Sequence, residues 1–487
     1  MAEFNARFVS RILGLLLLIE AAFMLLSLFV ALLYGGNDVM AFVYSTTITA
    51  LTGFALSFIG KNHSKELYRR EGIFIVATSW FFFSLFGLLP FYLSNSIPSI
   101  TDSFFETMSG FTTTGATILN NIETLPHGVL FWRSIIQWLG GMGIIVFTLA
   151  LLPLISSSGG IYLFNFEAPG LTHDKLRPRI DQTAKRLWGM YLVITLIEVL
   201  LLWVGPMNLF DAICHSFTTM ATGGYSTKQA SIAHWNSPYV EYIVSLFMFI
   251  AGINFANVYF VSTGRVRKVM KDEEFRWYTG IVLFFTFVVF IGLMVNREYG
   301  CDIEQTFRLS LFQVLTAMTS TGFATADYVI WGTFFWVIFM ILMLLGGSAG
   351  STSGGIKVVR MIVMIKNTIN EFFRNVHPRA IVPVRLNNHV LPFDLVSKVL
   401  AFIFLYMAIV LFSIIVLSAF GTGFEESIGG VITCIGNVGP GLGTVGPAGN
   451  FSALHPFVKW YLAFIMMIGR LELFTVLTLF TRAFWRK

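Results

Sequence analysis

The segment Thr112-Thr113-Thr114-Gly115-Ala116 has three counterparts further along the chain. They are Met220-Ala221-Thr222-Gly223-Gly224, Thr319-Ser320-Thr321-Gly322-Phe323 and Gly436-Asn437-Val438-Gly439-Pro440. Their central glycines recur about every hundred residues, and such a regular recurrence indicates a repeated architecture. Each segment follows a helix-like run that is too short to span a bilayer, so we predict a short helix and a turn in each repeat.

Long apolar runs flank these four segments. Of the 487 residues, 56% are hydrophobic and only 12% are charged, and the mean hydropathy is +0.75. A soluble domain carries about 25% charged residues, whereas roughly 20 apolar residues cross a bilayer as a helix. The first run, Ile12 to Leu33, follows Arg7 and Arg11 as a signal peptide would. Because it is longer than a typical signal and no small-residue cleavage site follows, we predict a retained helix.

The apolar runs predict ten membrane-spanning helices. Their approximate ranges are 11–34, 39–60, 71–94, 129–155, 186–205, 238–262, 277–296, 331–366, 393–420 and 457–482. Basic residues gather in the stretches Lys61 to Arg70, Lys175 to Arg186, Arg265 to Arg276 and Arg374 to Lys398. The positive-inside rule places these stretches, and both chain ends, on the cytoplasmic side. The net charge of +6 therefore reflects topology, and no nucleic-acid partner is expected.

The four segments also divide the chain. Residues 1–70 form an N-terminal helix pair, and the repeats occupy residues 71–165, 166–270, 271–385 and 386–487. Each repeat consists of a helix, a short helix, a turn and a second helix, and the second helix of the third repeat is expected to be broken. The predicted fold is an all-α polytopic membrane protein with the four repeats around a pseudo-fourfold pore.

Four equivalent turns around one axis suit a cation. Non-helical backbone is tolerated at membrane depth only where it is buried in protein or lines a watery cavity. Helix C-termini carry partial negative charge, and backbone carbonyls can replace the hydration shell of an ion. Glycine permits the dihedral angles that turn such carbonyls inward. We therefore predict a cation pore, with Asp102 and Asp211 capping the N-termini of the first two short helices.

A second unusual segment interrupts one predicted span. After the apolar residues Trp331 to Leu345, residues Gly346 to Gly355 comprise five glycines, three serines, one threonine and one alanine. Glycine costs about 1 kcal/mol in a helix interior relative to alanine, and serine and threonine offer competing backbone hydrogen bonds. We predict a loop beneath the four turns that gates the pore. The alternative is a small-residue patch at which helices pack closely.

The same stretch permits a different interpretation. Gly346-Gly347-Ser348-Ala349-Gly350 matches the G-x-S-x-G nucleophile elbow of hydrolases. Such an elbow needs a strand before the serine, whereas an apolar helix is predicted here. Of the eight histidines, only His215 falls clearly within the membrane, and it belongs to another repeat. An intramembrane serine hydrolase is therefore the weaker alternative, and we expect no enzymatic activity.

These features together resemble a known family, the membrane subunits of Trk-type potassium uptake in the Trk/Ktr/HKT superfamily. The resemblance covers nearly the whole chain, and the additional N-terminal helix pair is typical of the Trk branch. The segments that carry it are Asp102 to Thr117, Gln137 to Gly143, Gly346 to Arg360, Gly436 to Gly443 and Gly469 to Phe474.

The resemblance implies a potassium-selective pore in a bacterial cytoplasmic membrane and a homodimer with one pore per subunit. It also implies a cytosolic ring of TrkA-like nucleotide-binding regulatory subunits. Potassium is then the substrate, and no cofactor is expected in this chain. The expected potassium-binding residues are Thr113, Thr114, Gly115, Ala221, Thr222, Gly223, Ser320, Thr321, Gly322, Asn437, Val438 and Gly439. The expected gate consists of Gly346, Gly347, Ser348, Ala349, Gly350, Ser351, Thr352, Ser353, Gly354, Gly355 and Arg470.

Several charged residues keep two interpretations each. Arg470 lies about 21 Å along the last predicted span, where a bare charge is costly. It is either a clamp that binds carbonyls or a carboxylate, or an electrostatic barrier in the pore. Lys357 and Arg360 are either cytoplasmic anchors or parts of the gate. The loops Lys175 to Arg186 and Arg265 to Arg276 are either topology signals or docking surfaces for the regulatory ring. Glu106 is expected to bond neighbouring backbone.

Overall fold

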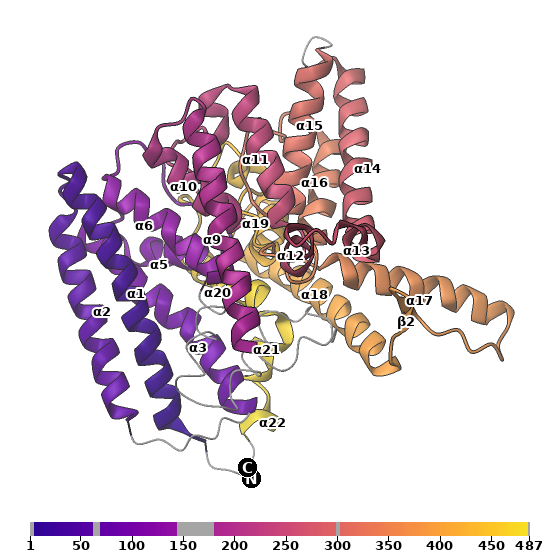
Figure 1. Cartoon of the computed structure of the whole chain (residues 1–487), viewed down its shortest axis with the longest axis horizontal. Helices are drawn as coiled ribbons and strands as arrows, with labels where there is room; N and C mark the ends of the chain where they lie inside the picture. Colours follow the sequence, from indigo (N-terminus) through magenta and orange to yellow (C-terminus); the bar gives the residue numbers. More distant parts are fainter. Residues whose placement is uncertain (1–3, 62–68, 144–179, 299–301, 486–487) are drawn as a thin grey trace.

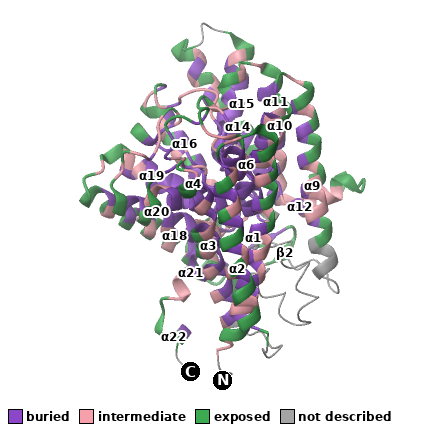
Figure 2. Cartoon of the chain, turned by 90° about the vertical axis from the view of Figure 1, so that its left-hand side faces the viewer, coloured by how far each residue is buried: buried purple, intermediate pink, exposed green. Residues whose placement is uncertain are grey.

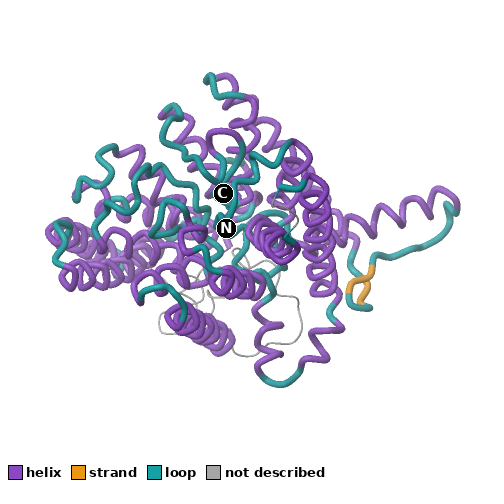
Figure 3. Tube along the Cα trace, turned by 90° about the horizontal axis from the view of Figure 1, so that it is seen from above, coloured by secondary structure: helices purple, strands orange, loops and turns teal. Residues whose placement is uncertain are grey.

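The computed structural model describes residues 4–61, 69–143, 180–298 and 302–485. Within these residues every regular element is helical except one antiparallel hairpin of strands β1 (Arg385–Leu386) and β2 (His389–Val390) (Figure 3). The all-α class predicted from the sequence is therefore confirmed. Buried residues are concentrated where the helices meet in the middle of the molecule (Figure 2).

Two long helices form a layer along one side of the molecule (Figure 1). They are α1 (Ala6–Tyr34) and α2 (Val39–Ile59). Helix α1 also packs against α3 (Arg69–Gly87) and α6 (His127–Trp138) of the first repeat. Gly14 and Gly53 face each other, and a Cβ on either would overlap the backbone of the other helix. Small residues permit this close approach of helices in membranes. Phe54 and Phe58 of α2 are about two thirds exposed, as expected for a lipid-facing surface.

After this pair, one order of elements recurs four times: a first helix, a short helix, a turn and a second helix. The first helices are α3 (Arg69–Gly87) with its extension α4 (Leu89–Leu93), α9 (Ile180–Val204), α14 (Glu273–Asn296) and α18 (Phe393–Ala419). The short helices are α5 (Ile100–Phe111), α10 (Leu209–Met220), α15 (Ile303–Met318) and α19 (Phe424–Gly436). The predicted boundary between the first two repeats, at residues 165 and 166, lies outside the described residues.

Side-chain hydrogen bonds determine where three of the short helices begin. Ser99, Asn208 and Asp302 each accept a hydrogen bond from the backbone N–H three residues further on. The prediction that Asp102 and Asp211 are the caps is therefore wrong by three residues. Both lie instead in the first turn of their helices, where a negative charge interacts favourably with the helix dipole.

The second helix is interrupted in every repeat. The successive pieces are α6 (His127–Trp138) with the π-helical turn η1 (Leu139–Gly143), α11 (Pro238–Ala251) with α12 (Phe255–Ser262), α16 (Thr333–Leu345) with α17 (Val358–Val376), and α20 (Pro456–Leu471) with α21 (Leu473–Thr478). The predictions of unbroken helices over 238–262 and 457–482 are therefore wrong, and α11 and α12 differ in direction by 108°. The predicted span 129–155 extends beyond the described residues.

Close packing against the short helices accounts for two of these interruptions. A Cβ at Gly140 would overlap the carbonyl oxygen of Phe111, the last residue of α5. A Cβ at Gly469 would likewise overlap the carbonyl oxygen of Ile435 near the end of α19. These glycines thus allow the second helices to touch the ends of the short helices within a few residues of each interruption, a contact that no local sequence pattern indicates.

The remaining elements complete the surface. By length and composition six of the described helices can cross a membrane, or seven if the bent pair α11–α12 counts as one span. Shorter elements are η3 (Ser231–Trp235), α13 (Val266–Lys271), η4 (Gly443–Val445) and α22 (Arg482–Trp485). Phe4 and Trp485 both lie 5.6 Å from the Arg70 guanidinium, so the first and last described residues lie at the same end of the molecule (Figure 1).

Candidate functional site: four inner turns and the loop beside them

Each short helix ends in a turn with the same backbone conformation. We call residues 113–115, 222–224, 320–322 and 437–439 the four inner turns. The first residue of each has a positive φ of 53° to 56°, and the last is a glycine with a positive φ of 73° to 105°. In each turn the N–H of the middle residue donates to the carbonyl five residues earlier, at 2.8 to 2.9 Å. The four turns are therefore equivalent in geometry as well as in sequence order.

This conformation is costly for the first residue of most of the turns. A positive φ is unfavourable for β-branched side chains, and Thr113 and Thr222 adopt it at 54° and 53°. Such strain costs of order 1–3 kcal/mol per residue and persists only where the surroundings hold it. Asn437 takes the same position in the fourth turn, and asparagine tolerates the left-handed region better. The turns are thus held in place by the fold rather than by local preference.

The second inner turn is displaced by one residue from the prediction. Gly224 has the left-handed backbone, with φ +73°, whereas Gly223 is the middle residue of the turn. Ala221, predicted as a potassium-binding residue, is the helical C-cap of α10, as Thr112 is of α5. The two adjacent glycines made the register ambiguous. Counting residues from the end of the short helix would have identified Gly224.

The four inner turns close on one another in chain order. The last glycine of each turn lies so near the middle carbonyl oxygen of the next turn that a Cβ would overlap that oxygen. The glycine and carbonyl pairs are Gly115 with Gly223, Gly224 with Thr321, Gly322 with Val438, and Gly439 with Thr114. Because the last pair leads from the fourth repeat back to the first, the turns form a closed ring. The structure therefore brings together the predicted residues of all four repeats except Ala221, with Gly224 in addition.

The ring gathers carbonyl oxygens that have few protein partners. The residues Thr114, Thr321 and Val438 are buried, and in the described part of the chain their carbonyl oxygens accept no hydrogen bond. The fourth, that of Gly223, accepts one from the side-chain amide of Gln137 at 2.6 Å. Buried carbonyls in proteins are nearly always paired, so such a set is suited to a ligand that carries positive charge. No carboxylate side chain belongs to the inner turns.

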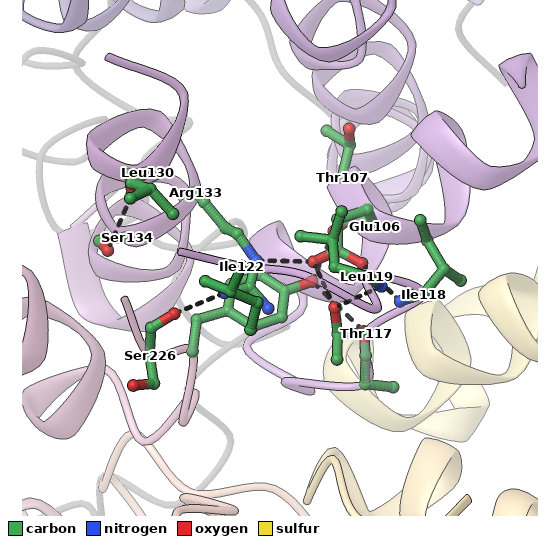
Figure 4. A network of polar contacts seen from close by, with 12 residues as sticks. Glu106, Thr107, Thr117, Ile118, Leu119, Ile122, Leu130, Arg133, Ser134 and Ser226 are labelled. Carbon is green, nitrogen blue, oxygen red and sulfur yellow. Dashed lines mark hydrogen bonds and ion pairs between the residues drawn. The ribbon is translucent and has the colours of Figure 1, made fainter. Parts of the chain in front are cut away.

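A buried polar network supports the first and second inner turns (Figure 4). Arg133 on α6 donates from Nε to Glu106 Oε1 at 2.7 Å and from a terminal nitrogen to the Ser226 carbonyl at 2.8 Å. Its guanidinium carbon also lies 3.7 Å from the centre of the Tyr225 ring. Glu106 accepts the backbone N–H of Ile118 at 2.9 Å, so the expected bonding to neighbouring backbone is confirmed, together with an ion pair that was not predicted.

The small-residue loop, residues 346–355, separates α16 from α17 and is largely buried. Thr352 donates from Oγ1 to the Met220 carbonyl at the end of α10, at 3.0 Å. The N–H of Gly354 donates to Oγ of Ser320, the first residue of the third inner turn, at 2.6 Å. The loop therefore lies against the ends of the second and third short helices, immediately beside the ring.

Arg470 joins three repeats. Its terminal nitrogens donate to the carbonyls of Thr352 in the small-residue loop at 2.7 Å, and of Gly140 and Gly141 in the first repeat, each at 2.6 Å. Of the two roles considered for Arg470, binding to carbonyls is the one that these contacts support. A role as a barrier to ions stays a prediction.

The two cations after the loop have partners inside the protein. Lys357 donates to the Ser353 carbonyl, and Arg360 pairs with Glu472 at the break between α20 and α21. The Arg360 guanidinium also lies 3.9 Å from the centre of the Phe402 ring. Lys357 therefore binds within the loop itself, whereas Arg360 connects the loop region to the fourth repeat, in addition to any role of either as a topology signal.

The hydrolase interpretation finds no matching geometry. Ser348 is buried after helix α16, whereas a nucleophile elbow follows a strand. His215 instead contacts the Asp211 carbonyl at 2.7 Å and the hydroxyl of Ser226 at 2.9 Å. Among the described residues, no histidine contacts Ser348, so this alternative is not favoured.

Comparison with known proteins agrees with the geometry. A family model named TrkH and described as a cation transport protein matches residues 38–487. The chain is 39% identical to the Trk system potassium uptake proteins TrkH of Salmonella typhimurium and of Escherichia coli K12, over 99% of this chain and of each relative. A crystal structure of the potassium transporter TrkH from Vibrio parahaemolyticus superimposes with a TM-score of 0.89 at 36% identity, and covers 99% of both chains.

The Arg133 network generates a prediction about stability. Replacing Arg133 by alanine leaves the Glu106 carboxylate buried without its cation, and removing one partner of a buried pair costs about 3–5 kcal/mol. We expect a clear fall in the midpoint of thermal denaturation in detergent. The control is Arg374→Ala, which removes the partly exposed partner of the exposed Glu371 and costs about 1 kcal/mol or less. Equal midpoints for the two variants would contradict the structural importance of the network.

Proposed function

Because the chain belongs to the TrkH family of cation transport proteins, we propose that it takes up potassium ions through the ring of inner turns. The observation that carries the proposal is the closure of four buried turns in chain order, each glycine against the carbonyl of the next turn. The relatives named above are potassium uptake proteins, and the helices of this chain are those of a multi-pass membrane protein.

The chemistry of the ring favours a bare monovalent cation. Carbonyl oxygens are neutral ligands that replace water around an ion without binding it as tightly as carboxylates would. The four short helices end directly at the ring, and their C-terminal partial charges add a negative potential there. In this proposal the site holds potassium as the transported substrate and needs no resident cofactor. An enzymatic role is not proposed.

In this proposal, the small-residue loop and Arg470 form the gate of the pore. The loop is attached to its surroundings mainly through backbone groups, including Gly354 N–H to Ser320 and the Thr352 carbonyl to Arg470. Its side chains are small, so displacing it breaks few packing contacts. Arg470 then acts as a latch, because the same guanidinium holds the loop and the carbonyls of Gly140 and Gly141.

We also propose the assembly that the resemblance implied. The protein is a homodimer in the bacterial cytoplasmic membrane, with both termini in the cytoplasm, and it binds TrkA-like nucleotide-binding subunits. The basic residues Arg265, Arg267 and Lys268 are exposed on or next to α13, which supports this short helix as a docking surface. Residues 175–179 of the other candidate docking loop lie outside the described residues.

The selectivity of the ring can be tested at its glycines. Gly115→Ser and Gly224→Ser each place a side chain on a left-handed backbone and against a carbonyl oxygen of the next turn. We expect either variant to admit sodium or to stop flux, measured as potassium and sodium flux in liposomes that contain the purified protein. The control is Gly280→Ser on α14, where an added Cβ meets nothing within 4 Å. Unchanged selectivity in both ring variants would exclude the ring as the filter.

The gate can be tested at Arg470. Arg470→Ala removes the hydrogen bonds that hold the loop, and we expect higher potassium flux and weaker dependence on the regulatory subunits. Deleting residues 349–353 should have the same effect. Arg470→Lys separates the latch from the electrostatic barrier. Lysine keeps the positive charge on which the barrier depends but lacks the planar fork of donors on which the latch depends. Wild-type flux and stability in Arg470→Ala would contradict both the latch and the barrier.

The docking surface can be tested by charge reversal. Changing Arg265, Arg267 and Lys268 together to glutamate should reduce co-purification of the regulatory subunits, because the proposed contact depends on positive charge. Membrane insertion should be normal. The matched control is Arg297→Glu, which lies at the opposite end of α14 from α13. Undiminished co-purification would remove α13 from the interface.

A further inference from the structure

The second inner turn lacks side chains that the first and third turns share. Thr112 and Thr114 join their hydroxyls at 2.8 Å, and Thr319 and Thr321 do the same at 2.8 Å. In each pair the first hydroxyl also donates to the helix carbonyl four residues earlier, at 2.7 Å. Both pairs thus connect the middle of the turn to the end of its short helix. The equivalent positions in the second turn are Ala221 and Gly223, which have no hydroxyl.

Gln137 of the first repeat occupies the space that this leaves. It lies in α6 and is fully buried, and a Cβ at Gly223 would overlap its side-chain amide. Its Nε2 donates to the Gly223 carbonyl at 2.6 Å, and its Oε1 accepts the N–H of Tyr225 at 3.1 Å. A carbonyl can only accept and an N–H can only donate, so the orientation of the amide is determined by its two partners.

The need for glycine at position 223 has a spatial cause. Gly223 does not have a positive φ, so its backbone conformation is open to other residues. What excludes a side chain is the Gln137 amide. Positions 115 and 224, in contrast, require glycine both because φ is positive and because a Cβ would overlap the carbonyl oxygen of the next turn. Gln137 and Gly223 are therefore complementary partners from different repeats.

We infer that Gln137 replaces the missing threonine of the second turn and is a specificity-determining residue that positions the Gly223 carbonyl. This inference rests on the proposed function of the ring. A carbonyl that already accepts a hydrogen bond is less free to rotate and is a weaker ligand than its three unpaired neighbours. One of the four oxygens in this layer is thus fixed from outside the ring, and the discrimination between cations of different radius depends on that fixed position.

The first experiment compares two buried glutamines. Gln137→Ala and Gln313→Ala each delete a buried amide with two hydrogen-bond partners, but the partners of Gln313 are Thr325 and Ala326, outside the ring. Potassium, rubidium and sodium fluxes are measured in liposomes with the full chain. We expect Gln137→Ala to lower the potassium-to-sodium flux ratio by about tenfold, the ratio that corresponds to one hydrogen bond. Gln313→Ala should leave the ratio unchanged.

A second variant keeps the test decisive if Gln137→Ala does not fold. Gln137→Met retains a side chain of similar length but can neither donate to Gly223 nor accept from Tyr225. It should fold and lose the same selectivity. A wild-type flux ratio in a folded Gln137→Met or Gln137→Ala protein would overturn the inference, and so would an equal loss of selectivity in Gln313→Ala.

A double-mutant cycle tests the complementarity itself. Gly223→Ala alone should lower the folded yield and the potassium flux, because its methyl group overlaps the Gln137 amide. In the Gln137→Ala background the same methyl group has room, so adding Gly223→Ala there should cost much less. Contacting residues show such non-additive effects, whereas independent sites add. Additive losses would overturn the proposed pairing.

The ring glycines separate failure of this inference from failure of the proposed function. If Gly115→Ser loses selectivity while both Gln137 variants keep it, the ring is the filter and Gln137 merely packs against it. If Gly115→Ser and Gly224→Ser keep selectivity as well, the filter assignment itself is excluded. Loss of selectivity in the ring variants and in Gln137→Met, but not in Gln313→Ala, supports both.

Discussion

The contact of a glycine with the carbonyl oxygen of the next turn is the constraint on which this structure depends. It occurs four times and returns from the fourth repeat to the first, so the ring closes without a gap. A single methyl group at any of these glycines would separate two turns. The short helices must therefore end at a common level, and the first residues of the turns must accept strained dihedral angles, with φ 54° at Thr113 and 53° at Thr222.

The interrupted second helices follow from the same convergence. Four short helices that end around one axis leave little space for the helices behind them, and glycines such as Gly140 and Gly469 allow the closest approach. Each interruption exposes backbone carbonyls that need donors. Arg470 supplies donors to two of these interruptions at once, through Gly140 and Gly141 in the first repeat and Thr352 in the third. A charge that would be costly alone is thereby surrounded by oxygen.

The four repeats are equivalent in backbone but not in side chains. Paired threonine hydroxyls support the first and third turns, whereas a side-chain amide from the first repeat supports the second turn. The fourth uses Asn437, whose Nδ2 donates to the Thr114 hydroxyl at 2.9 Å and to the Met466 carbonyl at 3.0 Å. A single chain with four repeats can assign a different support to each carbonyl, which four identical subunits cannot do.

The sequence by itself determined the membrane class, the number and order of the repeats' short helices and turns, and the loop at Gly346 to Gly355. Local composition predicts these features, because long apolar runs form membrane-spanning helices and clustered glycines disfavour a helix. Only the tertiary structure decided the breaks near Gly140 and Gly252 and the partners of Arg470. Those depend on groups that are hundreds of residues apart in the chain, such as Arg470 and Gly140, and on overlaps between backbones. The conformational preferences of neighbouring residues carry no information about such contacts. The backbone strain and the buried charge that these contacts compensate arise only when the four repeats close into a ring.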